Sequence, residues 1–584
     1  MLVLVCAGIA AGAVAGFMRG SAPILAEQNH VPALAQPLPE PVPEDGEDAL
    51  PEARAVVLSH HFLSAQLIDE TFSAIASRAP LRIVLVSPNH FGIGRGAFIT
   101  TDRSWETPHG VLAADRAAIV ALTGENIVVM DDAIFNREHG VFNIIPFVRK
   151  HFPNASIMPI AVDERAANAD IDALSVRLAR FSGAQIVIGS FDFSHELSSG
   201  AAEFHDARSI AVLRNLDSDG AARTEIDAKK GLRLVLAYAR EVGAERFELR
   251  KRSDAAEIVG REIPEGTTSY IHGYFLPGRK TPDETITVLG AGDIMLDRFM
   301  RQAVDRDGIR RVFIPLLRLL DGNDVTLANL EGPFTDFAPK PAKPDNLQFT
   351  FDPRIAPSLA AYGFSALSLA NNHTGNFGQK GLQSTRAYLN AAHIAHFGDP
   401  DNATSLSAIA TIRGKRIGFV GFNRLFQKSA DAVLAEIRAL RAGTDTVIVM
   451  PHWGNEYMPI PSENQKKLGR AFIDAGADIV LGSHPHVMQP IEEYGNGIIF
   501  YSLGNFVFDQ IRTRETREGL AVGLVIRKNS INAYVFPTLI EDWQVRLQEP
   551  ERRGMIWSDL AEHSMLSEIN RATLREKGVI TITK

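Results

Sequence analysis

Residues 285–298 read TITVLGAGDIMLDR, an apolar run that is followed at once by Asp293. Four further apolar runs in this half of the chain end in the same way: VTLAN at Asn329 and Glu331, ALSLA at Asn371, Asn372 and His373, TVIVMP at His452, and IVLGS at His484 and His486. Short apolar runs that alternate with helical stretches are typical of an α/β fold. The sequence therefore predicts strands that each deliver a polar side chain at their carboxyl end.

In α/β sheets, ligands bind beyond the carboxyl ends of the strands. Asp, Glu, Asn and His supply the oxygen and imidazole ligands that suit divalent ions such as Mn, Zn and Fe. A single Asp or Asn after a strand is most often a cap or a turn residue, but capping does not explain histidines at several strand ends. We expect a metal site at this edge. His484 and His486 are two residues apart, so both rings would lie on one side of an extended segment.

The composition narrows the class of protein. A chain of 584 residues is too long for one ordinary core, and 45% hydrophobic with 22% charged residues excludes wholesale disorder and a polytopic membrane protein. The net charge of −9 disfavours a nucleic-acid binder, so we expect no nucleic-acid partner. Cys6 is the one cysteine, which excludes a disulfide within the chain and a cysteine metal cluster.

The start of the chain differs from the rest. The first 17 residues carry no charge, and residues 33–53 are rich in Pro, Glu and Asp. We predict an apolar anchor or signal-like segment over 1–20 that attaches the protein to a membrane, and an extended acidic linker over 21–53. We expect the globular part outside the cytoplasm, although Arg19, by the charge rule, keeps the cytoplasmic side open.

The globular part is expected to form two domains. The polar stretch GRKTPDE at 278–284 precedes a new apolar run that is expected to form a strand. We place the boundary between the domains in this stretch, which predicts domains over 54–278 and 285–584. In the second domain, helices are expected at 355–362, 381–392, 430–442 and 463–475.

The first half carries its own set of histidines at predicted strand ends. His60 and His61 follow one apolar run, His90 follows another, and Asp192 and His195 follow a third. Because adjacent residues on a strand point to opposite faces, at most one of His60 and His61 is expected to face a site.

Six ordered motifs in the second half carry a resemblance. They are GDIMLDR (292–298), ANLEGPFT (328–335), LANNHTGNFG (369–378), PHWGNEY (451–457), GSHPHVMQPIE (482–492) and YSLGNFVFD (501–509). Together they resemble the CapA family of bacterial capsule and poly-gamma-glutamate synthesis, a branch of the calcineurin-like metallophosphatase fold, over about 285–510. The resemblance implies an α/β/β/α sandwich.

The same resemblance implies a dinuclear site of two divalent ions of the Mn, Zn or Fe class. Its implied ligands are Asp293, Glu331, Asn372, His452, His484 and His486. Asp293 and His373 are the implied catalytic residues, with His373 near the leaving group. The usual Asp-x-His opening is absent because Met295 stands at its third position, which implies a weaker first metal site.

Motifs in the first half resemble the Memo family, also called AmmeMemoRadiSam system protein B, over about 55–276. They are SHH (59–61), PNHFG (88–92), WETPHG (105–110), EHGVFNIIPF (138–147), PIAV (159–162) and GSFDFSH (189–195). The resemblance implies a Memo/LigB-like α/β domain, similar to the class III extradiol dioxygenases, with a pocket of His60, His90, His139, Asp192 and His195.

The family pattern is incomplete in this half. In the Memo family a metal can be bound by two His and one Cys. His60 and His90 match the two His positions, but Lys230-Gly231 stands where the family has Cys-Gly. The sequence is therefore compatible with one bound metal ion in this half and equally with no metal ion.

Three functions follow from these observations. The first is a metal-dependent, phosphoesterase-type hydrolase that acts on a phosphoester or an anionic polymer with the capsule-synthesis machinery. The second is a non-catalytic, membrane-tethered scaffold for assembly of the capsule polymer. The third places a redox or dioxygenase-type activity in the Memo-like half, and the missing Cys counts against it.

Overall fold

The computed structural model describes residues 52–338, 346–425 and 428–584. The predicted anchor at 1–20 and nearly all of the predicted linker at 21–53 lie outside these residues. Among the described residues, no helix is both long and apolar enough to cross a lipid bilayer.

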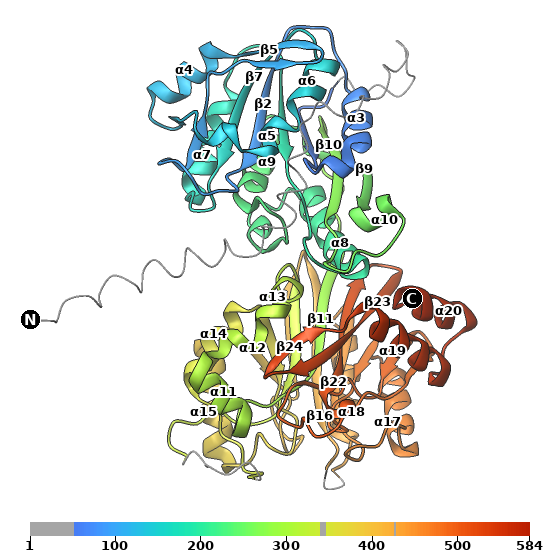
Figure 1. The fold of residues 1–584 in the computed structure, drawn as a ribbon. Helices are drawn as coiled ribbons and strands as arrows, with labels where there is room; N and C mark the ends of the chain where they lie inside the picture. Colours follow the sequence, from blue (N-terminus) through green and yellow to red (C-terminus); the bar gives the residue numbers. More distant parts are fainter. Residues whose placement is uncertain (1–51, 339–345, 426–427) are drawn as a thin grey trace, which may run out of the picture.

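The first half forms one ten-stranded sheet with helices on both faces (Figure 1). Its strands are β1 (Ala55–Leu58), β2 (Leu81–Pro88), β3 (Phe98–Thr100), β4 (Trp105–Thr107), β5 (Gly110–Ala114), β6 (Val129–Met130), β7 (Ala155–Val162), β8 (Gln185–Ser190), β9 (Arg246–Asp254) and β10 (Ser269–Leu276). Its helices are α3 (Ala65–Ser73), α4 (Arg116–Gly124), α5 (His139–Phe142), α6 (Ile145–His151), α7 (Asn168–Ala179), α8 (Ser199–Asn215), α9 (Lys229–Glu241) and α10 (Ala255–Val259). Strands β7, β2, β8 and β1 run parallel in that order, so their carboxyl ends share one edge.

The second half contains two further sheets. The nine-stranded sheet holds β11 (Ile286–Ile294), β12 (Val325–Leu330), β13 (Phe364–Ser368), β14 (Ala395–Phe397), β21 (Asn505–Val507), β22 (Glu518–Ile526), β23 (Ser530–Glu541), β24 (Gln544–Leu547) and β25 (Val579–Thr583). The six-stranded sheet holds β15 (Ser407–Ile412), β16 (Lys415–Asn423), β17 (Thr446–His452), β18 (Ile479–Leu481), β19 (Ile491–Tyr494) and β20 (Gly497–Phe500).

Helices flank these two sheets. They are α11 (Arg298–Asp307), α12 (Ile309–Phe313), α13 (Leu317–Leu320), α14 (Ala356–Ala361), α15 (Gly378–Ala391), α16 (Asp431–Arg441), α17 (Glu463–Asp474), α18 (Arg514–Arg517), α19 (Pro550–His563) and α20 (Glu568–Lys577). The four helices expected from the sequence correspond to α14, α15, α16 and α17, each within a few residues of its predicted limits.

Strand alternation explains how the layers stack. Val288 of β11 packs in the core between the sheets, whereas Leu289 packs against the helices on the outer face. Ile448 of β17 likewise faces the inter-sheet core, and Val449 faces α16 and α17. Successive side chains on a strand point to opposite faces, so each of these strands is covered on both sides. The predicted two-domain α/β fold with an α/β/β/α sandwich is confirmed, whereas the exact domain limits stay a prediction.

Helix α8 of the first half packs against β11, β22 and β23 of the second half (Figure 1). The ring of Phe204 on this helix lies 5.9 Å from the ring of Phe536, within the core of the second half. Arg208, one turn further along, pairs with the buried Asp324 at 3.0 Å. The two halves are therefore joined by apolar and ionic contacts along one helix.

Candidate metal centre

Asp293 is the second-to-last residue of strand β11, at the carboxyl edge of the nine-stranded sheet, and is buried. Its Oδ1 accepts a hydrogen bond of 2.7 Å from the Asn329 amide, and its Oδ2 accepts one of 3.1 Å from the backbone N–H of His484. The same Oδ2 is 3.4 Å from Nδ1 of His486. Asp293 therefore lies where both sheets meet.

Glu331 follows β12 and is buried beside Asp293. Its Oε1 is 3.8 Å from Nε2 of His486 and 3.9 Å from Nε2 of His373. Neither carboxylate oxygen has a hydrogen-bond partner among the described residues. Burial, together with the charge of Asp293, raises the pKa of Glu331 well above its ordinary value. A buried carboxylate without a partner is costly, and a cation would remove this cost.

His452 is the last residue of β17, in the six-stranded sheet, and is fully buried. Its Nε2 lies 2.8 Å from Oδ1 of Asn372, and its Nδ1 lies 3.0 Å from Oγ of Ser483. Burial and the nearby charges of His484 and His486 lower the pKa of His452 well below its ordinary value. The ring is therefore neutral, the form in which imidazole binds metals.

His484 and His486 lie in a turn after β18, so the expected extended segment is wrong. Both residues have left-handed backbone, with φ of 93° and 58°. This conformation is costly for residues with a side chain, and such strain clusters at functional sites. The turn brings the two rings to a centroid distance of 5.7 Å, with His484 Nδ1 buried and without a hydrogen-bond partner among the described residues.

His373 borders the same cluster. Its ring stacks on Phe349 at a centroid distance of 4.2 Å, and its Nδ1 lies 3.3 Å from Oδ1 of Asn376. Burial lowers its pKa to about 4. The ring is therefore neutral near pH 7, with its Nδ1–H directed at Asn376 and the lone pair of Nε2 facing Glu331.

All six predicted ligands therefore meet at one edge of the sandwich. Carboxylates and histidines form two groups whose ligand atoms lie within 4.8 Å of one another, Asp293–Glu331–His486 and Glu456–His484–His486. The unpartnered oxygens of Glu331 and the unpartnered Nδ1 of His484 fit a cation in both groups. Asn372 joins the cluster through His452.

Three residues of this cluster were not among the implied ligands or catalytic residues, although Asn329 was expected at this edge of the sheet. Glu456 is four residues after His452, and its signal was an acid inside the motif PHWGNEY. Asn329 orients Asp293. Arg298 lies close enough to lower the pKa of Glu331 by its charge, against the effect of burial, and it pairs with Asp509 at 3.1 Å. Met295, at the position of the missing His, is buried in the apolar core instead.

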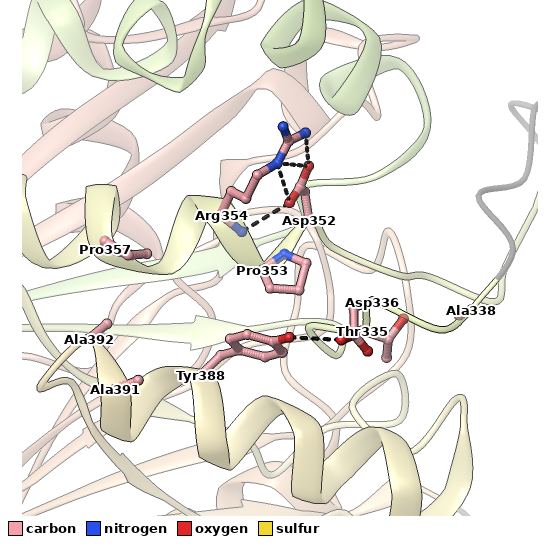
Figure 2. Close-up of a pocket in the computed structure, with 10 residues that line it drawn as sticks. All are labelled: Thr335, Asp336, Ala338, Asp352, Pro353, Arg354, Pro357, Tyr388, Ala391 and Ala392. Carbon is pink, nitrogen blue, oxygen red and sulfur yellow. Dashed lines mark hydrogen bonds and ion pairs between the residues drawn. The ribbon is translucent and has the colours of Figure 1, made fainter.

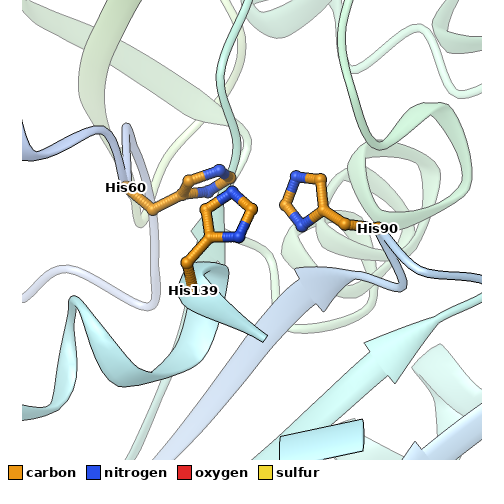
Figure 3. Close-up of side chains that lie close together, drawn as sticks. All are labelled: His60, His90 and His139. Atoms are coloured by element: carbon orange, nitrogen blue, oxygen red, sulfur yellow. The ribbon is translucent and has the colours of Figure 1, made fainter. Parts of the chain in front are cut away.

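The predicted pocket of the first half is a second cluster. His60, His90 and His139 approach one another from the β1 end, the β2 end and α5, with ring centroids 4.1–5.1 Å apart (Figure 3). Oδ2 of Asp192 lies 3.5 Å from Nε2 of His60. His195 lies beside Glu225, with 3.9 Å between its Nδ1 and the carboxylate.

The neighbouring His61 does not join the three rings, and its Nδ1 lies 3.0 Å from the hydroxyl of Tyr270. The expectation that at most one of His60 and His61 faces the site is confirmed. Asp227, which no motif singled out, also contacts His60 and His90.

A cavity of about 500 Å³ lies away from both clusters, between α15 and the segment around Asp352. Figure 2 shows its lining, in which Arg354 pairs with Asp352 and the Tyr388 hydroxyl donates to Asp336. These polar groups satisfy one another, so the cavity offers little to a ligand.

The fold and the two clusters define a class, a two-domain α/β protein with histidine and carboxylate side chains gathered at the carboxyl edges of its sheets. Residues 287–510 match the family model of the bacterial capsule synthesis protein PGA_cap, and residues 33–263 match that of Memo-like proteins.

Individual relatives match the same two halves. The capsule biosynthesis protein CapA of Bacillus anthracis is 33% identical over 43% of this chain and 67% of its own length. The PGA biosynthesis protein CapA of Bacillus subtilis is 30% identical over 43% of this chain and 70% of its own length. A MEMO1 family protein of Methanosarcina barkeri is 30% identical over 30% of this chain and 70% of its own length. The chain belongs to the bacterial capsule synthesis (CapA) family through its second half, fused to a Memo-like first half.

Proposed function

We propose that the second half is a metal-dependent hydrolase of the phosphoesterase type that works in synthesis of the bacterial capsule polymer. The polymer class comes from the relatives, whose names refer to capsule and PGA biosynthesis. The proposal of a hydrolase activity rests on the arrangement of the residues in the candidate metal centre.

Glu331 carries this proposal. A buried carboxylate with two unpartnered oxygens, beside a second buried carboxylate, is unfavourable in a protein that only needs to fold. Two histidines, His484 and His486, place ligand atoms close to these carboxylates and to Glu456, which a structural role does not require. Bound cations would offset the unfavourable burial of the Glu331 carboxylate.

The residues divide the work as follows. When bound, divalent ions at this cluster would polarise a phosphoryl or carboxyl oxygen and make a water more acidic. Asn329 holds Asp293 in place, and the Asn372 amide contacts His452. His373 would contact the oxygen of the leaving group through Nε2, which lies beside Glu331, while its Nδ1 faces the side-chain oxygen of Asn376. Arg298 adds positive charge near the position of an anionic substrate.

The test is phosphodiesterase activity of the full chain on bis-p-nitrophenyl phosphate with Mn²⁺. We expect activity that His484→Ala abolishes and that His563→Ala leaves unchanged, because His563 is an exposed histidine on α19 that pairs with Asp559. A protein that binds metal at this cluster but stays inert towards phosphoesters and polyglutamate would favour the scaffold instead.

We also propose that residues 1–20 attach the protein to a membrane, on the basis of the uncharged apolar run at its start. Cell fractionation of the full chain and of a variant lacking 1–53 tests this. A full chain found only in the soluble fraction would contradict it.

A further inference from the structure

Arg298 is a firmly held cation at the border of the candidate metal centre. It is the first residue of α11 and has left-handed backbone, with φ of 54°. This conformation costs free energy for a residue with a side chain, whereas glycine adopts it readily. Such strain clusters at functional sites. The fold therefore keeps a strained arginine where a glycine would fit more easily, which indicates a role for the side chain.

The Asp509 carboxylate fixes the plane of the guanidinium. Nε of Arg298 donates to it at 3.1 Å, and Nη2 donates to its other oxygen. The Phe299 backbone N–H donates to the same carboxylate at 3.1 Å, and the Asp509 side chain is only 2% exposed. The pair is therefore oriented before any ligand arrives.

The guanidinium keeps free donors. An arginine has five N–H groups, and the contact with Asp509 uses two of them. Nη1 has no hydrogen-bond partner among the described residues, and it is not one of their buried polar atoms, so it is open to solvent. The side chain as a whole is 10% exposed. An anion can therefore reach Arg298 without breaking its ion pair.

Two aromatic rings join Arg298 to the metal centre. The guanidinium carbon lies 5.0 Å from the centroid of the Phe349 ring and 5.7 Å from that of Phe508. Phe349 also stacks on the His373 ring, with 4.2 Å between the centroids. Phe508 lies edge-on to the His486 ring at 4.9 Å. A cation within about 6 Å of a ring face is attracted to it, so these contacts hold the guanidinium beside both histidines.

The charge of Arg298 reaches the groups of the metal centre. Burial raises the pKa of Glu331, and the charge of Arg298 acts against this effect. Burial lowers the pKa of His373 to about 4, and the same charge adds to that effect. An anion held among these groups would lie within the range of the guanidinium as well.

We infer that Arg298 binds a second anionic group of the substrate, so that the site selects substrates with two neighbouring anionic groups over those with one. The inference rests on the proposed function for the position of the first group, which bound cations would hold. The planar fork of an arginine matches the geometry of a carboxylate. An acidic polymer meets the requirement because its carboxylates repeat along the chain, whereas a simple ester with one charge does not.

Arg512 is the competing cation at this edge. Burial raises the pKa of Tyr457, and the charges of Arg298 and Arg512 both act against this effect. Arg512 is exposed, and no ion pair holds it within the part of the chain that the structure describes. A mobile arginine loses rotamer freedom when it binds a ligand, and an arginine that is already fixed does not. The selectivity should therefore come from Arg298.

The test compares glutarate with valerate, two acids of five carbons that differ by one carboxylate. Their binding to the Mn²⁺-loaded full chain is measured by calorimetry. The wild-type protein should prefer glutarate by about 10–100-fold, the range of hydrogen bonds to a charged group. Arg298→Met should reduce this preference to below about threefold and leave the affinity for valerate unchanged. Arg298→Lys should give an intermediate preference, because an ammonium keeps the charge and a partner for Asp509 but lacks the fork.

Two control variants accompany these measurements. Arg354→Met is the matched control, since Arg354 also pairs with a neighbouring aspartate, Asp352, but lies away from the metal centre (Figure 2). Arg354→Met and Arg512→Met should both keep the preference for glutarate. Scanning calorimetry and Mn²⁺ affinity check that each variant is folded and still binds the ion.

The outcomes separate this inference from the proposed function. A protein that binds no Mn²⁺ would refute the proposed function, and this inference would fail with it. A protein that binds Mn²⁺ but does not prefer glutarate would overturn this inference alone. The inference is also overturned if Arg512→Met removes the preference while Arg298→Met keeps it, or if Arg298→Met weakens both acids equally, which would show a purely structural role.

Discussion

Replacing Glu331 with glutamine should stabilise the metal-free protein and abolish its stabilisation by divalent ions. The carboxylate is buried, and both of its oxygens lack hydrogen-bond partners among the described residues. Burial and the Asp293 charge raise its pKa well above the ordinary value. A glutamine amide carries no charge and can donate a hydrogen bond to Asp293, so it removes the unfavourable interaction.

The direction of the pH dependence follows from linkage. An acid whose pKa is raised by folding binds its proton more tightly in the folded state. Its ionisation therefore weakens the fold as the pH rises above the ordinary pKa of a glutamate, until the folded-state pKa is passed. The metal-free wild-type protein should lose this component of stability with rising pH, and Glu331→Gln should not.

The magnitude comes from the unpartnered group. A buried polar group without a partner costs about 1–3 kcal/mol, and more when it is charged. In a domain of this size each kcal/mol moves Tm by about 2–4 °C, so we expect an increase on the order of 5 °C in EDTA. An ion at 100 times its Kd stabilises the wild-type protein by about 2.7 kcal/mol, and the variant should gain none of this.

Scanning calorimetry in EDTA and in Mn²⁺ measures both effects. Glu492→Gln is the matched control, because Glu492 is also buried but accepts hydrogen bonds from Arg470 at 2.8 Å and from the Tyr501 hydroxyl. The control should lower Tm in either buffer. The reasoning is refuted if Glu331→Gln lowers Tm in EDTA, or if Mn²⁺ still stabilises it as it does the wild-type protein.

Three further results are expected. Asn329→Ala should lower Mn²⁺ affinity by about 10–100-fold in calorimetry, since Asn329 orients Asp293 and His452, and an unchanged affinity would show that it does not. Asp324→Ala should cost about 3–5 kcal/mol in urea unfolding because it leaves both Arg208 and Arg413 without their shared carboxylate, and a loss below 1 kcal/mol would show that this buried ion-pair network adds little stability. Dialysis against EDTA should abolish phosphodiesterase activity and Mn²⁺ should restore it, whereas activity that survives complete metal removal would exclude the proposed hydrolase.

Much of the second half was predictable because its signals are local. The helix expected at 463–475 begins after Ser462, whose side chain forms a capping box with Gln465, and such caps are readable from a few neighbouring residues. The apolar runs that end at Asp293 and His452 became β11 and β17, as the pattern predicted.

The failures concern turns and distant contacts. The segment from His484 to His486 was expected to be extended, but two left-handed residues bend it so that the backbone N–H of His484 reaches Asp293. No local sequence pattern predicts this bend, because the hydrogen bond that accompanies it joins residues 191 positions apart. Asp227 was missed for the same reason, since its partners His60 and His90 are in other loops.

The sequence by itself determined the kinds of ligand available and the fold that carries them. It placed carboxylate, amide and imidazole groups at the ends of apolar runs, and its single cysteine excluded a thiolate site in the described body of the protein. Only the tertiary structure decided which of these groups meet. Strand order and loop geometry bring Glu331 to His486 and Asp227 to His60 and His90, and these contacts depend on packing between sheets that no local preference encodes.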